Sequence, residues 1–362
     1  MDSISQYVLG AGIGVATMGR RTKVWKAALW GGIAGTIPDL DALVDHGDPI
    51  RNMTFHRTES HSLFYLTLFS PLLAWAVTRL HGEAQHFRRW WLALWAALVT
   101  HPLLDTMTIY GTQLLLPFTD HPFAIGSVFI IDPLYTVPLF LGLVATGIDR
   151  GPRRLRWNAL GVALSTAYLG WSVAAQGWAT GVAQRDLAAA GIRHERLLVT
   201  ATGLNTLLWR VLAMEPGGAS YVEGFWSPFD RGRVIRFDRF ASDRALFDQL
   251  RGNWGLERMA WFSHGFFKVE RRGAAATIAD LRMGQEPNYT FTFEVARRTP
   301  NPGWAEVPYE AVGARGDLGA LLRWLGPRML GADRPPPRAA APVEPLPELK
   351  LHATPARRPT SP

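Results

Sequence analysis

The sequence predicts a membrane α-helical bundle of about six apolar segments, followed by a small α+β domain outside the cytoplasm. Three observations lead to this fold class. Long apolar runs dominate the first 180 residues, basic residues alternate between the loops that join them, and short runs of β-branched and aromatic residues follow. The sequence therefore divides into a polytopic membrane domain at 1–180, a soluble α+β domain at 181–330 and a Pro/Ala/Arg-rich tail, expected to be disordered, at 331–362.

Six apolar segments make up the predicted membrane domain. They lie at about residues 8–18, 27–38, 63–78, 90–104, 128–148 and 157–179. The last two reach the ~20 residues that a helix needs to span a bilayer, while the first two are short and glycine-rich and are expected to form a tight or re-entrant hairpin. The opening M-D-S-I-S-Q-Y contains no Lys or Arg, so it lacks the basic region of a cleavable signal peptide and is expected to remain in the mature protein.

Basic residues in the connecting loops predict the topology. The loops after the first, third and fifth segments hold eleven of them: Arg20, Arg21, Lys23, Lys26, Arg79, Arg88, Arg89, Arg150, Arg153, Arg154 and Arg156. The alternate loops hold only two, Arg51 and Arg57. This pattern indicates six crossings with the basic loops in the cytoplasm, so the N-terminus and everything beyond residue 180 are expected outside. Buried helices of a large soluble protein are the less favoured alternative.

The second half has the pattern of a mixed α+β domain. Strands are predicted at Arg196–Ala201, Thr206–Met214, Tyr221–Trp226, Arg258–Phe262, Phe266–Glu270, Ala276–Leu281 and Tyr289–Val295. One helix is predicted at Ser242–Arg251, with Ser242 as its N-cap. We expect an antiparallel sheet with one helix.

Composition excludes several kinds of site. The chain contains no cysteine, so disulfides and thiolate metal sites are excluded, and any metal must be held by His, Asp, Glu, backbone or water. The formal net charge is +8, but the basic residues are spread over short loops and the tail without a basic stripe. We therefore expect no nucleic-acid partner, and the lipid bilayer is the expected environment.

Four polar clusters interrupt the membrane domain, all on the predicted outer side. They are P-D-L-D with Asp39 and Asp41, F-H-R-T-E-S-H-S with His56 and His61, H-P-L-L-D with His101 and Asp105, and I-I-D-P with Asp132. His101 and Asp105 share one helix face if their helix continues through Pro102. Ionisable groups at membrane depth cost about 3 kcal/mol each, so their convergence from several segments needs a reason.

Metal binding is the reason that these residue types favour. Imidazole and carboxylate together suit zinc and other first-row divalent ions. Each residue also has a plainer interpretation, because an Asp after Pro is a common turn former and a lone buried His is usually a hydrogen-bonded structural residue. Taken together, the clusters favour a metal site over a purely structural polar network.

The same residues carry a resemblance to a known family. The matching segments are D-S-I-S-Q at 2–6, G-T-I-P-D-L-D at 35–41, H-R-T-E-S-H-S at 56–62, T-H-P-L-L-D at 100–105, Y-G-T-Q at 110–113 and F-I-I-D-P-L-Y at 129–135. As an ordered set they resemble the YdjM-like family of LexA-regulated, inner-membrane proteins described as metal-dependent hydrolases. F-S-H-G-F at 262–266 and D-L-R-M-G at 280–284 are similar to the extension of family members. One departure is Gly14-Val15, where the family pattern has Gly-Glu.

The resemblance implies a multi-pass protein of the bacterial inner membrane that binds a divalent metal. Zinc is the first choice for this metal. The expected ligands come from Asp39, Asp41, His56, His61, His101, Asp105 and Asp132, the last either as a ligand or as a partner that orients a histidine. Glu59 and His61 are the expected catalytic residues, with Glu59 as general base, although a salt bridge to Arg57 or a solvated position suits Glu59 equally well. Asp2 and Gln6 are expected to help close the site.

The predicted activity is hydrolysis of an ester or phosphoester of a lipid or lipid-linked carrier, because a site at bilayer depth and open outward meets lipid headgroups. The alternative is a non-enzymatic membrane protein, either an ion or proton transporter or a structural or binding protein, that uses the same polar cluster. A transporter is expected to distribute polar residues through the bilayer, whereas here they cluster at one end. That clustering favours the hydrolase.

Overall fold

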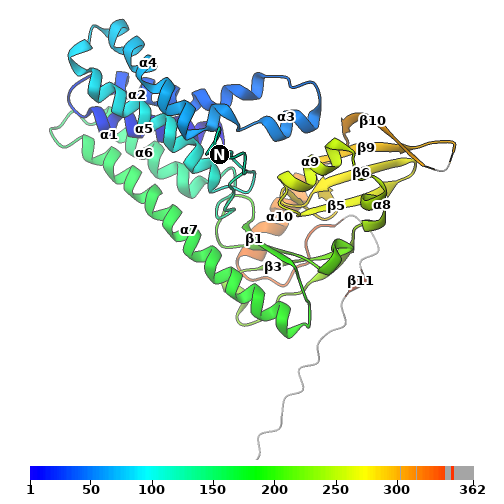
Figure 1. Cartoon of the computed structure of the whole chain (residues 1–362). Coiled ribbons are helices and arrows are strands. Elements are labelled where there is room, and N and C mark those ends of the chain that lie inside the picture. Colours follow the sequence, from blue (N-terminus) through cyan, green and yellow to red (C-terminus); the bar gives the residue numbers. More distant parts are fainter. Residues whose placement is uncertain (302, 315, 339–343, 346–362) are drawn as a thin grey trace, which may run out of the picture.

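A computed structural model describes residues 1–301, 303–314, 316–338 and 344–345, and consists of a helical N-terminal region and a mixed α+β C-terminal region (Figure 1). The helices are α1 (Ser3–Met18), α2 (Val24–Thr36), α3 (Pro49–Phe55), α4 (Leu63–His81), α5 (Phe87–Thr106), α6 (Pro133–Ile148), α7 (Leu155–Ala189), α8 (Arg244–Gln249), α9 (Trp254–Phe262) and α10 (Leu318–Met329). The 3-10 turns are η1 (Ile37–Leu43), η2 (Glu59–His61), η3 (Ala84–His86), η4 (Pro216–Gly218) and η5 (Pro228–Asp230). The six predicted apolar segments correspond to α1, α2, α4, α5, α6 and α7.

Glycines join α1 and α2 into the tight pair that the sequence predicts. Gly10 of α1 and Gly31 of α2 lie so close that a Cβ built on either would fall 2.2–2.3 Å from the carbonyl oxygen of the other. Gly14 faces the Ala27 carbonyl in the same way, at 2.3 Å. Only glycine permits this approach, and it fixes the end of α2, which leads into η1.

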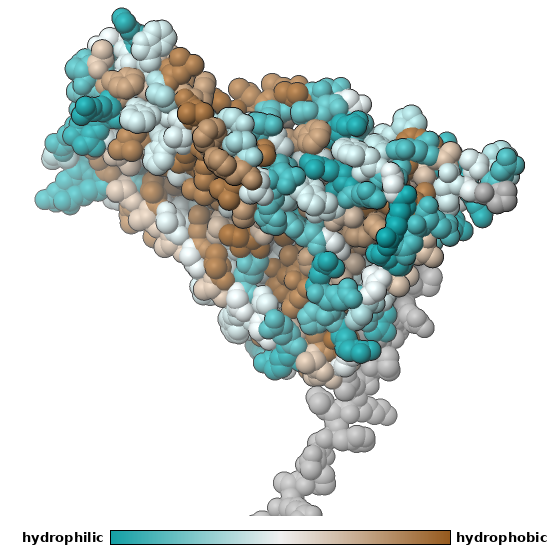
Figure 2. Space-filling view, viewed as in Figure 1, coloured by the Kyte–Doolittle hydropathy of each residue, from teal (hydrophilic) through white to brown (hydrophobic). Residues whose placement is uncertain are grey.

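Apolar side chains gather on the face of the helical region that Figure 2 shows. They include Leu68, Leu72 and Trp75 of α4 and Phe140 and Leu141 of α6, each more than half exposed. Exposed apolar surface on this scale is typical of contact with lipid or a partner. Among the described helices, α4 is the one long and apolar enough to cross a membrane by itself, and α6 is a shorter apolar helix. The six-crossing topology stays a prediction.

Helix α7 connects the two regions. Its 35 residues run from the bundle to the strands of the C-terminal region, where Ala179, Ala183 and Leu187 pack against the first sheet (Figure 1). Gln176 of α7 donates to the carbonyls of Ile125 and Val199, so helix, loop and strand are joined at one point. The C-terminal region is therefore completed by a helix that begins in the bundle.

The C-terminal region contains two main sheets, both antiparallel, rather than one. Their strands are β1 (Arg196–Ala201), β2 (Trp209–Met214), β3 (Ser220–Trp226), β4 (Asp238–Ala241), β5 (Phe267–Arg272), β6 (Ala275–Asp280), β9 (Thr292–Arg298), β10 (Trp304–Ala311) and β11 (Glu344–Pro345), with a ribbon of β7 (Gly284–Gln285) and β8 (Asn288–Tyr289). The spatial orders are β1-β2-β3-β4-β11 and β10-β9-β6-β5. In the first sheet Val199 lies opposite Val211, which lies opposite Gly224.

Two local predictions change in this region. The strand predicted at Arg258–Phe262 is wrong, because these residues lie in α9, which begins after the Asn253 cap and buries Leu256, Met259 and Phe262 at helical spacing. Helix α8 confirms the predicted helix, but its N-cap is Asp243, whose carboxylate accepts from the Leu246 amide. The expectation of a single helix is wrong, because α9 and α10 also lie in the described part of this region. Of the predicted tail, residues 331–338 and 344–345 are described, and Trp324 donates to the Arg334 carbonyl there. The rest of the tail lies outside the described residues.

Candidate metal centre

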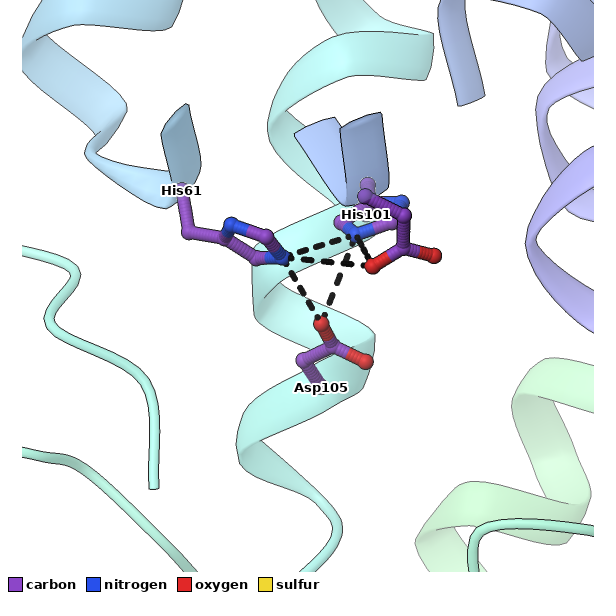
Figure 3. A group of neighbouring side chains, drawn as sticks. His61, His101 and Asp105 are labelled. Carbon is purple, nitrogen blue, oxygen red and sulfur yellow. Dashed lines mark hydrogen bonds and ion pairs between the residues drawn. The ribbon is translucent and has the colours of Figure 1, made fainter. Parts of the chain in front are cut away.

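Four side chains from three separate elements meet at one point below the apolar bundle surface. They are Asp39 of η1, His61 of η2, and His101 and Asp105 of α5, and one ligand atom from each lies within 4.8 Å of all the others. Figure 3 labels His61, His101 and Asp105 and shows their polar ends turned toward one another. His61, His101 and Asp105 are completely buried, and the Asp39 side chain is 20% exposed.

The distances within this group are close to one another. The Nε2 atom of His61 lies 3.5 Å from Asp39 Oδ1 and 3.3 Å from Asp105 Oδ2. The Nε2 atom of His101 lies 3.3 Å and 3.4 Å from the same two oxygens, and the two Nε2 atoms are 3.1 Å apart. Four ligands held about 2.0–2.2 Å from a zinc ion in tetrahedral geometry are about 3.3–3.6 Å from one another. The donor set and its spacing therefore fit such an ion.

Local structure explains how the group forms. Helix α5 continues through Pro102 to Thr106, so His101 and Asp105 lie one turn apart on one face, as predicted. The tight α1–α2 pair places the end of α2 beside α5, and η1 then carries Asp39 to the group. Ser62 caps α4 and ends η2, which holds His61 at the start of that helix.

Hydrogen bonds on the outer ring nitrogens aim both histidines at the centre. The Nδ1–H of His101 donates to the Gly35 carbonyl at 2.7 Å, since a carbonyl can only accept. The Ser60 hydroxyl donates to Asp41 at 2.6 Å, so it accepts from Nδ1–H of His61 at 2.8 Å. Both Nε2 lone pairs are thus left for the centre, and the His61–Ser60–Asp41 chain is the kind of second layer that orients metal-binding histidines.

Charges around the group are strongly coupled. Burial lowers the pKa of His61, but the facing carboxylates of Asp105, Asp39 and Asp41 outweigh this effect and raise the pKa to about 9. Burial raises the pKa of Asp39, yet the histidine hydrogen bonds bring it far below its usual range. His56 and His61 do the same for the pKa of Asp41. The carboxylates are therefore ionised, and in the metal-free protein His61 takes up a proton in their field.

Asp105 is held by neighbours, but one of its oxygens has no hydrogen bond among the described residues. Gln6 donates to its Oδ1 at 3.0 Å, and the amino group of Met1 contacts the same oxygen. Its Oδ2 faces Arg57 Nε at 3.2 Å and both histidines, and has no hydrogen-bond partner among the described residues. A buried carboxylate oxygen without a hydrogen bond, aimed at two imidazole lone pairs, is what a metal ligand without its ion looks like.

The other predicted site residues occupy different places. Asp41 and His56 form a second layer, with His56 Nδ1 2.8 Å from Asp41 Oδ1 and the His56 ring 5.8 Å from that of His61. Glu59 is exposed, and Arg57 pairs with Asp105 instead of Glu59. Asp132 does not join the group of four, because its carboxylate caps α6 at Leu134 and accepts from Tyr168.

Near the N-terminus, Gln6 reaches the group as expected, while Asp2 caps α1 by accepting from the amides of Ile4 and Ser5. Sequence reasoning missed the roles of Arg57 and Ser60. Both lie between the two histidines of the F-H-R-T-E-S-H-S segment, which was the available signal. Arg57 has a left-handed backbone, φ 66°, which turns its side chain toward Asp105 while its amide donates to Asp41.

Comparisons with known proteins bear on the helical region. A family model described as "YdjM inner membrane protein" matches residues 1–179. The uncharacterized protein YfhP of Bacillus subtilis (strain 168) is 26% identical over 175 residues, which are 47% of this chain and 53% of the relative. The chain thus spans about half the length of this curated relative. No solved structure matches the chain. The family match includes all four members of the ligand group and ends within α7.

Proposed function

Because residues 1–179 belong to the YdjM inner membrane protein family, we propose that the chain is a metal-dependent hydrolase of the bacterial inner membrane. Asp39, His61, His101 and Asp105 hold one divalent ion, zinc in the first place, and the substrate is an ester or phosphoester of a lipid or lipid-linked carrier. The single observation that carries the proposal is that two imidazole nitrogens lie 3.1 Å from each other and each lies 3.3–3.5 Å from the same two carboxylate oxygens.

The ion would supply the electrophile. A divalent ion in this group lowers the pKa of a water molecule that it binds and polarises the oxygen of an ester or phosphoryl group. Asp39 is the one partly exposed member of the group, so substrate and water approach from its side. The three buried side chains and Asp39 would hold the ion, and the exposed side of the group, beside Asp39, would admit the water molecule that a catalytic site needs.

Proton transfer is assigned to the second layer. Glu59, the expected general base, is exposed, and its neighbour Arg57 is engaged with Asp105. His56 suits the role better, because it is half-buried, Asp41 fixes its Nδ1, and its ring lies edge-on to His61. Asp41 orients His56 and, through Ser60, His61 as well. His61 itself acts as a ligand.

Exposed apolar residues beside the group support a lipid-borne substrate. Leu40, Leu43 and Val44 of η1 and its end are 58%, 82% and 54% exposed, next to Asp39 and Asp41 in the chain. Apolar side chains at a polar site suit the boundary between headgroups and acyl chains. With the alternation of basic loops, we place this end of the bundle, and the C-terminal domain, on the outer side of the membrane.

One observation favours a non-enzymatic alternative. Arg57 and the amino group of Met1 already counter the charge of Asp105 without any ion, as they would in a polar network that only braces the bundle. In that case the four side chains stabilise the fold, and metal adds nothing.

Metal analysis distinguishes the two readings. The detergent-purified protein is expected to contain one equivalent of a divalent metal, and a His61→Ala/His101→Ala variant almost none. His86→Ala, in η3 at the far end of α4, is the matched control and keeps the metal. Hydrolysis of a phosphoester substrate in mixed micelles then tests the enzyme. If the wild-type protein contained metal but had no activity, the metal site would be confirmed and the hydrolase proposal would be wrong.

A further inference from the structure

We propose that the C-terminal region contains a binding site for the guanidinium group of an arginine in a proline-rich segment, and that the chain's own tail fills this site as a reversible latch. The site lies on β3 and β4 of the first sheet and consists of Glu223, Asp238 and the ring of Phe240. The latch segment is G-A-D-R-P-P-P-R at 331–338, which ends with Arg338. Neither the metal group nor the proposed hydrolysis uses these residues.

The register of two strands creates the site. Glu223 of β3 lies directly opposite Asp238 of β4, and Tyr221 lies opposite Phe240. Side chains alternate between the two faces of a strand, so both carboxylates and the Phe240 ring belong to the same face of the sheet. The Glu223 side chain is completely buried, and that of Asp238 is 28% exposed. Like charges directly across two strands destabilise a sheet, so this pair of carboxylates favours cations beside it.

An arginine of the sheet balances only one of these two charges. Nε of Arg210 donates to Glu223 Oε1 at 2.6 Å. The Nη1 and Nη2 atoms of Arg210 are already engaged, because they donate to the Leu281 carbonyl at 2.7 Å and to the Tyr289 hydroxyl at 3.2 Å. The second oxygen of Glu223 and the carboxylate of Asp238 therefore form a negative site for a further cation.

Arg338 of the latch segment fits this site. Its Nη2 atom donates to Glu223 Oε2 at 2.9 Å, and its Nη1 atom contacts Asp238 Oδ2. Its Cζ atom lies 4.8 Å from the centroid of the Phe240 ring, and its side chain is only 11% exposed. The planar fork of a guanidinium can serve two carboxylates and an aromatic ring at once, whereas an ammonium group is a compact, strongly hydrated charge. The site therefore selects arginine over lysine.

The rest of the latch segment is held loosely. None of residues 331–338 is fully buried, so the segment adds little to the hydrophobic core. Trp324 of α10 donates its indole N–H to the Arg334 carbonyl at 3.0 Å, which is a contact with the backbone and not with a side chain. Three consecutive prolines restrict the backbone before binding, so such a segment loses little entropy when it docks. Arg338 is therefore the anchor of the segment.

Opening of the latch leaves the rest of the region intact. When Arg338 leaves, Glu223 keeps its ion pair with Arg210, so no buried charge is left alone. Asp238 is partly exposed and can be hydrated. Segments with few buried apolar contacts open at low free energy. The open site is then available to an arginine of the same kind on another peptide, which competes with a tethered segment at millimolar effective concentration.

The test measures peptide binding to the full chain in detergent. The probe is a fluorescein-labelled peptide, G-A-D-R-P-P-P-R, and its binding is followed by fluorescence anisotropy. Arg338→Ala empties the site and is expected to bind this peptide at least tenfold more tightly than the wild type, whose own tail competes. A peptide with lysine at its last position is expected to bind Arg338→Ala at least tenfold more weakly. Adding Asp238→Asn to Arg338→Ala weakens binding of the arginine peptide by the same factor.

Two matched controls leave the site unchanged. Arg334→Ala removes an exposed arginine of the same segment, and this variant is expected to bind the peptide as weakly as the wild type. Asp248→Asn changes an exposed aspartate of α8. Combined with Arg338→Ala, it is expected to leave peptide binding unchanged.

Each outcome decides the proposal. Equal binding by Arg338→Ala and the wild type, or equal binding of the arginine and lysine peptides, overturns it. Absence of saturable binding to Arg338→Ala also overturns it, because Arg338 is then only a brace within the chain. The arginine peptide, unlike the lysine peptide, is expected to raise the unfolding temperature of Arg338→Ala toward that of the wild type.

A second variant serves if Arg338→Ala does not fold. Arg338→Lys keeps a positive charge between the two carboxylates but lacks the planar fork. It is expected to bind the arginine peptide at least threefold more tightly than the wild type does. No gain in binding over the wild type overturns the proposal.

Discussion

The Nε2 atoms of His61 and His101 lie 3.1 Å apart, although each ring has its Nδ1–H committed to a partner on the opposite side. Two neutral imidazoles in this arrangement would direct lone pair against lone pair. A cation must therefore lie between them, either a proton or a metal ion. The following predictions concern this position and the structure around it.

Metal is expected to stabilise the folded protein through this position. Adding zinc or cobalt to the chelator-treated protein raises its unfolding temperature, with a stabilisation of about 2.7 kcal/mol when the free metal is one hundred times the dissociation constant. Cobalt gives an absorption spectrum typical of tetrahedral coordination. His101→Ala is expected to lose both effects, while His86→Ala keeps them. Equal stabilisation of His101→Ala would place the metal elsewhere.

The pH dependence of metal binding follows from His61. Its pKa is raised from 6.5 to about 9 in the metal-free protein, so that its stabilisation is fully present below pH 6.5 and is lost as pH rises through 9. Metal needs the neutral ring and competes with this proton. Metal affinity is therefore expected to rise about tenfold per pH unit between pH 6.5 and 9, as measured by competition with a chelator. A flat profile would exclude His61 as a ligand.

Ser60 is expected to control metal affinity without contacting the metal. Ser60→Ala removes the hydroxyl that links His61 Nδ1 to Asp41, and loss of such an orienting partner typically costs 10–100-fold in metal affinity. The unfolding temperature of the metal-free protein changes little. Ser3→Ala, at an exposed serine of α1, serves as control. A Ser60→Ala variant with unchanged affinity would show that the hydrogen-bond chain has no part in binding.

Close packing of α1 and α2 is expected to be required for the site. Gly31→Ala places a methyl group 2.3 Å from the Gly10 carbonyl, and the resulting separation of the helices costs about 1–3 kcal/mol. Because the Gly35 carbonyl orients His101, metal affinity falls as well. Gly147→Ala in α6, where no heavy atom lies within 4 Å of the added Cβ, is the control. Normal metal affinity in the Gly31→Ala variant would show that the metal site does not depend on the close packing of α1 and α2.

The predicted topology can be tested with reporter fusions. A phosphatase fused after residue 191 is expected to be active outside the cytoplasm, whereas one fused near Arg153 is silent. The physical reason is the excess of eleven basic residues over two in the loops assigned to the cytoplasm. The reverse result would mean that the metal group faces the cytoplasm. The argument for a substrate on the outer side of the membrane would then fail.

Much of the helical region was predictable because the apolar runs that indicate its helices are long. Six apolar runs mark six helices, and the His-x-x-x-Asp spacing of His101 and Asp105 requires only a continuous helix to bring them together. The family resemblance, carried by the ordered motifs, is confirmed over residues 1–179. Long periodic segments leave few alternatives, so the prediction succeeds there.

Short-range geometry was not predictable. Asp39 and Asp41 are two residues apart in one 3-10 turn, and only the turn decides that Asp39 joins the group while Asp41 serves the second layer. Asp132 looked equivalent in sequence, but the proline after it makes it a helix cap. The five residues Arg258–Phe262 are too few to distinguish the period of a strand from that of a helix.

Helix α7 is a single rod that both regions share. Its 35 residues are about 52 Å long. Gln176 joins this rod to the loop at Ile125 and to the strand at Val199, so the three segments are expected to move together. A change in the tilt of α7 within the bundle would then reach the first sheet as a rigid-body movement.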